Sequence, residues 1–127
     1  MMTFGNVAVE AVRVCRTEKI APEAGWIRAV GFAFPSSKSM REKSCPRSSF
    51  LGLCDEGLVK GISAGEYTAS LKNKAYALAA VSKLRVNPDL TERPQVLWEA
   101  VMNGKTKAHN EQMVVVVALW NAGLIRG

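Results

Sequence analysis

The chain has 127 residues, of which 17 are Lys or Arg and 11 are Asp or Glu, so its formal net charge is +6. Apolar residues make up 48% and charged residues 22%, proportions that exclude a fibre, a collagen, a low-complexity tail and a disulfide-rich mini-protein. Because domains cluster at roughly 100–150 residues, we expect a single domain over 1–127.

Two helices are predicted over the first part of the chain. Apolar residues recur every three or four positions, the period of one helical face, which predicts a helix over about 3–18. Pro22 suits the first turn of a second helix, where its missing N–H costs nothing. That helix carries Trp26 and should end before Pro35, because the residue before a proline avoids helical geometry.

A polar segment and a third helix are predicted next. The sequence SSKSMREKS at 36–44 is the most polar stretch and is predicted to form a loop. Pro46 then opens a third helix, with Ser44 or Cys45 as its cap, and Gly57 ends it.

The second half of the chain begins with a predicted connector over 58–68, which has two glycines and no sustained period. A fourth helix is predicted over about 69–86. It is apolar on every side at 75–81, a pattern that predicts a buried helix. A fifth helix has Thr91 as its predicted cap and Gly104 at its end.

The sixth helix, predicted over about 107–122, contains four consecutive valines at 114–117. β-Branched residues favour strands. No turn residue separates the valines from their neighbours, however, and about fifteen residues is the length of a helix rather than a strand. The sequence therefore predicts an all-α fold of about six helices in one domain.

An internal repeat relates residues 53–61 to residues 119–127 through the pattern L-x-x-x-G-L-[VI]-[KR]-G. Each copy resembles a helix ended by a left-handed glycine, with the next leucine folding back on the last turn. One interpretation is a tandem of two three-helix units, about 1–61 and 67–127, related by a pseudo-twofold axis. The alternative is that unrelated helix ends converge on Gly-Leu.

Two segments carry a family resemblance. CPRSSFLGLCDEGLVKGI at 45–62 and HNEQMVVVVALWNAGLI at 109–125 resemble a family of small uncharacterised bacterial proteins of unassigned function. The resemblance implies a self-standing soluble bacterial domain and supplies no activity.

The positive charge is spread evenly, since each half of the chain has a net charge of +3. Such scatter is typical of a solvated surface. The one concentration of cations lies at 36–47, with a single acid, and we expect this segment to be a contact surface. Its four cations are Lys38, Arg41, Lys43 and Arg47. An acidic protein, a phosphorylated ligand or a nucleic acid could each be the partner.

Cys45 and His109 are the candidate catalytic residues. Cys45 lies at a predicted helix start beside several cations, and both features favour the reactive thiolate. His109 is the only histidine, so any histidine base must be it; it is predicted in the first turn of the sixth helix. Together they suggest a thiol-dependent enzyme or redox sensor. The alternatives are an unreactive half-buried cysteine and a polar helix start. Cys15 and Cys54 fall on apolar faces and are predicted to be core residues.

No metal or cofactor is expected, because the sequence lacks CxxC, HExxH, GxxxxGK[ST] and GxGxxG motifs. The longest apolar run, 113–120, is well short of the about twenty residues that a membrane span needs. Glu10 interrupts the amino-terminal apolar pattern, which argues against a signal peptide, so we expect a cytoplasmic protein. The leading functional hypothesis is a non-enzymatic binding or regulatory module.

Overall fold

All regular elements of the chain are helical in the computed structural model, which describes residues 2–127. The all-α fold class is therefore confirmed: over that range the only β-type pairing is one isolated bridge. The elements are α1 (Phe4–Glu18), α2 (Pro22–Ala33), α3 (Lys38–Arg41), α4 (Ser44–Asp55), α5 (Leu71–Val86), the 3-10 helix η1 (Pro88–Glu92), α6 (Pro94–Met102) and α7 (Gln112–Asn121). Six of them match the predicted helices, and α3 and η1 are short additions.

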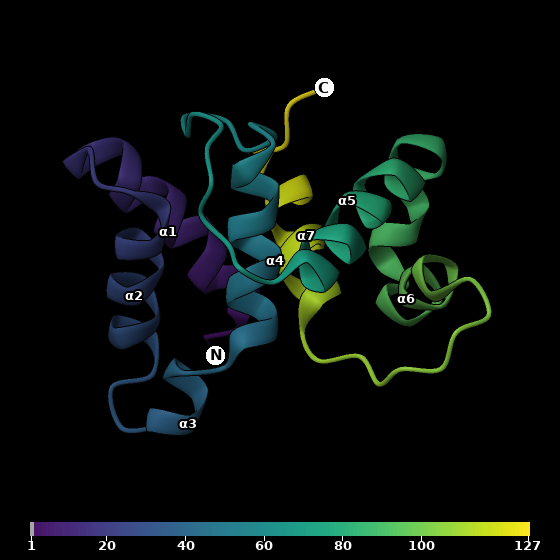
Figure 1. Ribbon diagram of the computed structural model, residues 1–127, viewed down its shortest axis with the longest axis horizontal. Helices are drawn as coiled ribbons and strands as arrows, with labels where there is room; N and C mark the ends of the chain where they lie inside the picture. The colour runs from purple at the N-terminus through teal and green to yellow at the C-terminus, as the bar shows by residue number, and fades with distance from the viewer. Residues whose placement is uncertain (1) are drawn as a thin grey trace.

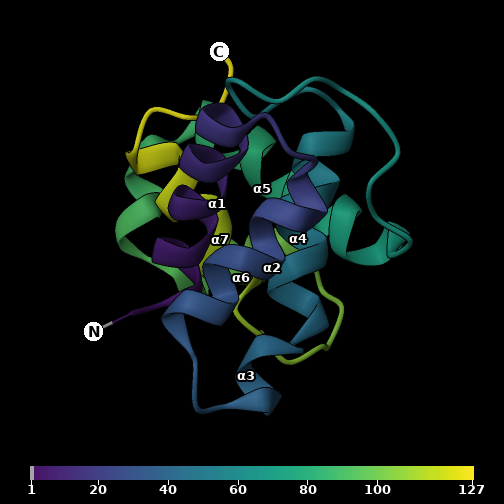
Figure 2. The same ribbon diagram turned by 90° about the vertical axis from the view of Figure 1, so that its left-hand side faces the viewer.

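The helices α4 and α7 lie at the centre of the molecule (Figure 1). α1, α2 and α3 lie on one side of this central pair, and α5 and α6 lie on the other. α4 packs against α5, and α7 packs against α1, which the side view also shows (Figure 2). The last helix of each half of the chain therefore contacts the first helix of the other half.

Glycines allow these two helix crossings to be close. A Cβ added at Gly5 in α1 would lie 2.7 Å from the Cβ of Ala118 in α7. A Cβ added at Gly52 in α4 would lie 2.7 Å from the Cα of Lys74 in α5. Neither distance is compatible with a side chain, so glycine at these positions lets the helix backbones pack directly on their neighbours.

Aromatic residues fill the core on both sides of the central pair. Trp26 stacks on Phe50, with ring centroids 5.4 Å apart, and lies 6.4 Å from Phe4. On the other side, Trp98 meets the edge of Tyr76 at 5.4 Å. Trp26 and Trp98 are core residues, 1% and 2% exposed, whereas Trp120 is half-buried.

The two copies of the glycine–leucine pattern have the same local structure. Gly57 and Gly123 both adopt left-handed backbone angles, with φ of 69° and 72°. In each copy the next leucine N–H donates back to the last turn of the helix. The bonds run from Leu58 to the Leu53 carbonyl (3.1 Å) and from Leu124 to the Leu119 carbonyl (3.0 Å). Both copies are therefore helix ends of the kind that the sequence predicts.

The two copies also pair with each other. Val59 and Ile125 form the isolated antiparallel bridge, and two reciprocal hydrogen bonds hold it. The Lys60 N–H donates to the Leu124 carbonyl and the Arg126 N–H donates to the Leu58 carbonyl, each over 2.8 Å. These bonds tie the end of one half to the end of the other. A pseudo-twofold relation between the whole halves stays a prediction.

Two details of the predicted helices are wrong. The fourth helix is not buried all round: Ala75 is exposed and Leu78 is half-buried, because α5 packs on its neighbours through one face only. Thr91 does not cap the fifth helix; it lies inside η1, where its hydroxyl donates to the Pro88 carbonyl (3.1 Å). Arg93 occupies the position before α6 instead, and Pro94 stands in the first turn of that helix.

Helix starts near the basic segment also differ from the prediction. Part of the expected loop at 36–44 forms the single turn α3, which Ser37 caps through its hydroxyl. α4 begins two residues before Pro46, with Lys43 at the cap position and no capping side chain. α7 begins only at Gln112. Glu111, the residue before it, has a left-handed backbone (φ 72°) and therefore cannot be part of the helix.

Candidate functional site

The four cations of the basic segment 36–47 have different surroundings. The Arg41 guanidinium donates through Nη1 to the carbonyls of Phe34 (2.9 Å) and Pro35 (2.8 Å), so it fixes the turn after α2. Lys43 donates through Nζ to the side-chain oxygen of Asn110 (3.1 Å), which fastens the segment to the residues before α7. Lys38 is exposed on α3.

Arg47, the fourth cation, lines a pocket of about 440 Å³ between the amino-terminal ends of α4 and α5. The pocket draws residues from three parts of the chain. They are Glu23 of α2, then Ser44, Arg47, Ser48 and Leu51 of α4, and finally Tyr67, Thr68, Ala69 and Ser70 before α5. Arg47 and Ser48 contribute a cation and a hydroxyl donor, while Leu51 adds an apolar surface.

The amino terminus of α4 is open to a ligand. No side chain caps it, and its first turn contains no acidic residue. The helix start presents the positive end of the helix dipole and the free N–H groups of Ser44 and Cys45, a combination that favours an anion. Pro46 has no N–H, and the Lys43 N–H donates to the Met40 carbonyl (3.4 Å). The start of α5 differs, because the Ser70 hydroxyl already accepts hydrogen bonds from the Asn73 backbone N–H (3.4 Å) and side-chain amide (3.1 Å).

Ser48 supplies a second, independent feature of the pocket. The residue is only 6% exposed, and over residues 2–127 its hydroxyl makes no hydrogen bond. The adjacent Ser49 behaves differently, since its hydroxyl donates to the Cys45 carbonyl (2.9 Å). The hydroxyl is not cut off from solvent, because the one fully buried side-chain polar atom without a partner in residues 2–127 is Trp26 Nε1. Ser48 is therefore a hydrogen-bond donor available to a molecule in the pocket.

The buried carboxylate of Asp55 fixes one wall of the pocket. Its Oδ1 accepts hydrogen bonds from the backbone N–H groups of Tyr67 (2.6 Å) and Thr68 (3.3 Å). Its Oδ2 lies 3.4 Å from the Lys74 ammonium, which also pairs with Glu56 at 2.9 Å. These two carboxylates, Glu56 foremost, raise the pKa of Lys74. Asp55 thereby ties the chain before α5 to the end of α4.

His109 caps α7 from outside the helix. It precedes α7, so the prediction that it lies in the first turn is wrong. Its Nε2 accepts the backbone N–H of Met113 (3.0 Å), and its ring lies 5.2 Å from that of Trp98. Burial lowers its pKa, and the nearby Glu111 offsets part of that effect. The neutral imidazole is the form that accepts this bond.

Cys45 lies in the first turn of α4 and is half-buried. The bond between Lys43 and Asn110 brings the segments that carry Cys45 and His109 together. No hydrogen bond joins the two side chains in the part of the chain that the structure describes, and His109 Nε2 is engaged by Met113. A catalytic pair of these residues stays a prediction.

The other two cysteines are core residues, as predicted. Cys15 is 6% exposed and Cys54 is fully buried, and all three cysteines are free thiols. Burial raises the pKa of both core thiols, which keeps them protonated. Within residues 2–127, no three His, Cys, Asp or Glu side chains are grouped as a metal site would require. No helix in this range has the length and apolar composition to span a membrane.

Sequence reasoning missed most of this pocket. It identified Arg47 through local charge, but Ser48 and the wall at 67–70 carry no charge. The available signal was a group of hydroxyl residues at two successive helix starts, Ser44 and Ser48 in α4 and Thr68 and Ser70 before α5. Their meeting at one pocket depends on the packing of α4 against α5.

The chain belongs to a family of unknown function, DUF6979, whose model matches residues 1–126. This agrees with the resemblance to an uncharacterised family drawn from the two segments of the sequence. No curated protein and no solved structure matches the chain.

Proposed function

We propose that this member of a family of unknown function is a non-enzymatic binding module that takes a small phosphorylated ligand in the pocket between α4 and α5. One observation carries the proposal: the guanidinium of Arg47, the uncapped start of α4 and the hydroxyl of Ser48 all belong to one pocket. Three different donors of positive potential or hydrogen bonds thus meet there.

Each donor has a role that suits a phosphate group. Free N–H groups at the start of α4 bind phosphate oxygens, and the helix dipole adds favourable potential. The planar guanidinium of Arg47 matches two oxygens of a phosphate at once. The Ser48 hydroxyl donates a further bond. The volume of about 440 Å³ lies in the range of small-molecule pockets and has room for more than the phosphate alone.

Glu23 and Leu51 determine which chemical groups the pocket favours in the part of the ligand beyond its phosphate. Leu51 offers an apolar surface to its organic part. The Glu23 carboxylate repels a bare phosphate but accepts hydrogen bonds from a hydroxyl or amino group. The pocket therefore favours a phosphorylated compound that carries such a donor beside its phosphate. The nucleic-acid and acidic-protein alternatives would need cations that are free along a continuous surface, whereas Arg41 and Lys43 are engaged within the chain.

All three cysteines are free thiols, and this indicates in which cellular compartment the protein works. Reduced cysteines are typical of a reducing environment, and this supports the proposal that the protein works in the cytoplasm.

The test is a titration of the full chain with inorganic phosphate at constant ionic strength, followed by amide chemical shifts. We expect saturable shifts at Ser44, Arg47 and Ser48. Arg47→Gln should weaken binding about tenfold, since a hydrogen bond to a charged group contributes about 1.5–3 kcal/mol. Glu23→Gln should strengthen it by removing a like charge. Lys83→Gln, at the opposite end of α5, removes the same charge outside the pocket and should leave binding unchanged.

Two results would refute the proposal. One is the absence of saturable shifts at the start of α4. The other is an equal loss of affinity in Arg47→Gln and Lys83→Gln, which would mean that phosphate responds to net charge alone and has no site.

A further inference from the structure

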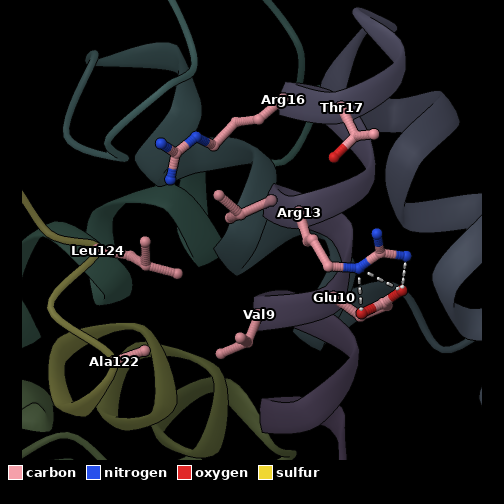
Figure 3. A pocket seen from close by; sticks show the side chains of 8 residues that line it. Val9, Glu10, Arg13, Arg16, Thr17, Ala122 and Leu124 are labelled. Carbon is pink, nitrogen blue, oxygen red and sulfur yellow. Dashed lines mark hydrogen bonds and ion pairs between the residues drawn. The ribbon is translucent and has the colours of Figure 1, made fainter.

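A trough separate from the phosphate pocket runs along α1 and the end of α7. Two adjoining hollows of about 560 and 680 Å³ form it, and they share Val9, Glu10 and Ala122. Figure 3 shows the first hollow, where Val9 of α1 faces Ala122 and Leu124 of the carboxy-terminal segment, while Arg13 turns away to pair with Glu10. The hollows continue one another along the helix, so the trough is longer than a pocket for one small molecule.

Large apolar side chains are exposed at one end of this trough. Phe32 of α2 is 81% exposed and Met2 is 42% exposed, and both line the second hollow. Val9 and Leu124 continue the apolar lining into the first hollow and are only partly buried. Exposed apolar surface of this kind, bordered by charged residues, is typical of a contact site for another protein.

Arg16 provides a fixed, unpaired cation at the other end. Its side chain lies on the backbone of Gly61: a Cβ there would be 2.5 Å from the Arg16 Cδ, and Gly61 has a left-handed φ of 88°. Among residues 2–127 the Arg16 guanidinium makes no hydrogen bond or ion pair, whereas Arg13 pairs with Glu10. The guanidinium extends over the hollow beside Leu124 (Figure 3).

We propose that the trough is the docking site of an amphipathic helix from an acidic partner protein. The apolar stripe of that helix covers Phe32, Val9 and Leu124, and a carboxylate at its end pairs with Arg16. The trough follows α1, whose 15 residues span about 22 Å, so it accommodates about four turns of a partner helix. The unpaired Arg16 and the net charge of +6 supply the charge complementarity that selects an acidic partner.

The experiment is a selection on the immobilised full chain from a phage-displayed library of helix-forming peptides of about four turns. We expect selected peptides to carry an apolar stripe with spacings of three and four residues and an acidic residue at one end. Synthetic copies are then measured by fluorescence anisotropy. Arg16→Gln should weaken binding about fivefold and Phe32→Ser about tenfold or more. Ile27→Ser, which removes an exposed apolar residue of α2 outside the trough, should leave it unchanged.

Several outcomes would overturn the proposal. Peptides that bind Phe32→Ser and Arg16→Gln as tightly as they bind the wild-type chain would occupy another surface. A selection that yields no peptide, or peptides without an acidic residue, removes the charge complementarity. Self-association of the wild-type chain in analytical ultracentrifugation that Phe32→Ser abolishes would assign the trough to a second copy of this chain instead.

Discussion

Replacement of Asp55 with Ala tests how the pocket wall is held. The substitution removes both hydrogen bonds from the Tyr67 and Thr68 N–H groups to a buried carboxylate. A hydrogen bond to a charged group contributes about 1.5–3 kcal/mol. Because both donors are half-buried and can partly rehydrate, we use the lower figure for each and expect a loss of about 3 kcal/mol in the free energy of unfolding. Asp55→Asn retains a carbonyl acceptor at Oδ1 and should cost less.

Urea unfolding followed by circular dichroism measures these losses, with Glu66→Ala as the control. Glu66 is an exposed acid in the same connector, and its loss should change the free energy of unfolding by less than about 0.5 kcal/mol. A single domain has about 5–15 kcal/mol of stability, so each variant should remain folded without urea. An Asp55→Ala value within about 0.5 kcal/mol of wild type would refute this reasoning. Equal losses in Asp55→Ala and Asp55→Asn would show that charge, rather than hydrogen bonding, holds the wall.

Three further predictions concern the repeat, the histidine and the half-buried cysteine. Gly57→Ala and Gly123→Ala should each lower the free energy of unfolding by about 1–2 kcal/mol, because both positions are left-handed; urea unfolding measures this. His109→Ala should cost about 1 kcal/mol at pH 7 by removing the cap on the Met113 N–H. The folded pKa of His109 lies below its unfolded value of about 6.5, so this contribution is complete above that pH and is lost as the pH falls. If Cys45 is a reactive thiol, iodoacetamide should alkylate it far faster at neutral pH than the buried Cys15 and Cys54, which intact-protein mass spectrometry measures.

Each of these three predictions would be contradicted by a specific result. Equal stability of wild type and both glycine variants would contradict the helix-end geometry. A stability difference between wild type and His109→Ala that does not shrink as the pH falls below about 6.5 would contradict the cap. Alkylation of Cys45 no faster than that of Cys15 and Cys54 would remove the thiol-enzyme alternative.

Local signals explain why the first helices could be predicted. Thr3 caps α1 reciprocally with Asn6, and Pro22 stands in the first turn of α2. Both signals act within one helical turn, so the sequence contains them in full. The start of α7 could not be read in the same way, because it depends on the left-handed backbone of Glu111 and on a bond from Met113 back to His109. The run of residues before it looks helical by period alone.

The candidate site was predictable only in part. Clustering of four cations indicated the segment 36–47, but it could not separate Arg47 from Arg41, whose guanidinium is used by carbonyls six and seven residues away. The pocket wall at 67–70 comes from the other half of the chain, and Asp55 fixes it there. Burial of α5 was overestimated because alanines such as Ala75 are tolerated at the surface as well as in the core.

The most direct measurement of the phosphate site is a crystal structure of the chain grown with tungstate, a tetrahedral oxyanion with strong anomalous scattering. We expect an anomalous peak in the pocket, at hydrogen-bond distance from the Arg47 guanidinium, the Ser48 hydroxyl and the first N–H groups of α4. In crystals of Arg47→Gln the peak should be lost. A wild-type structure with tungstate bound elsewhere and none in this pocket would contradict the proposed function.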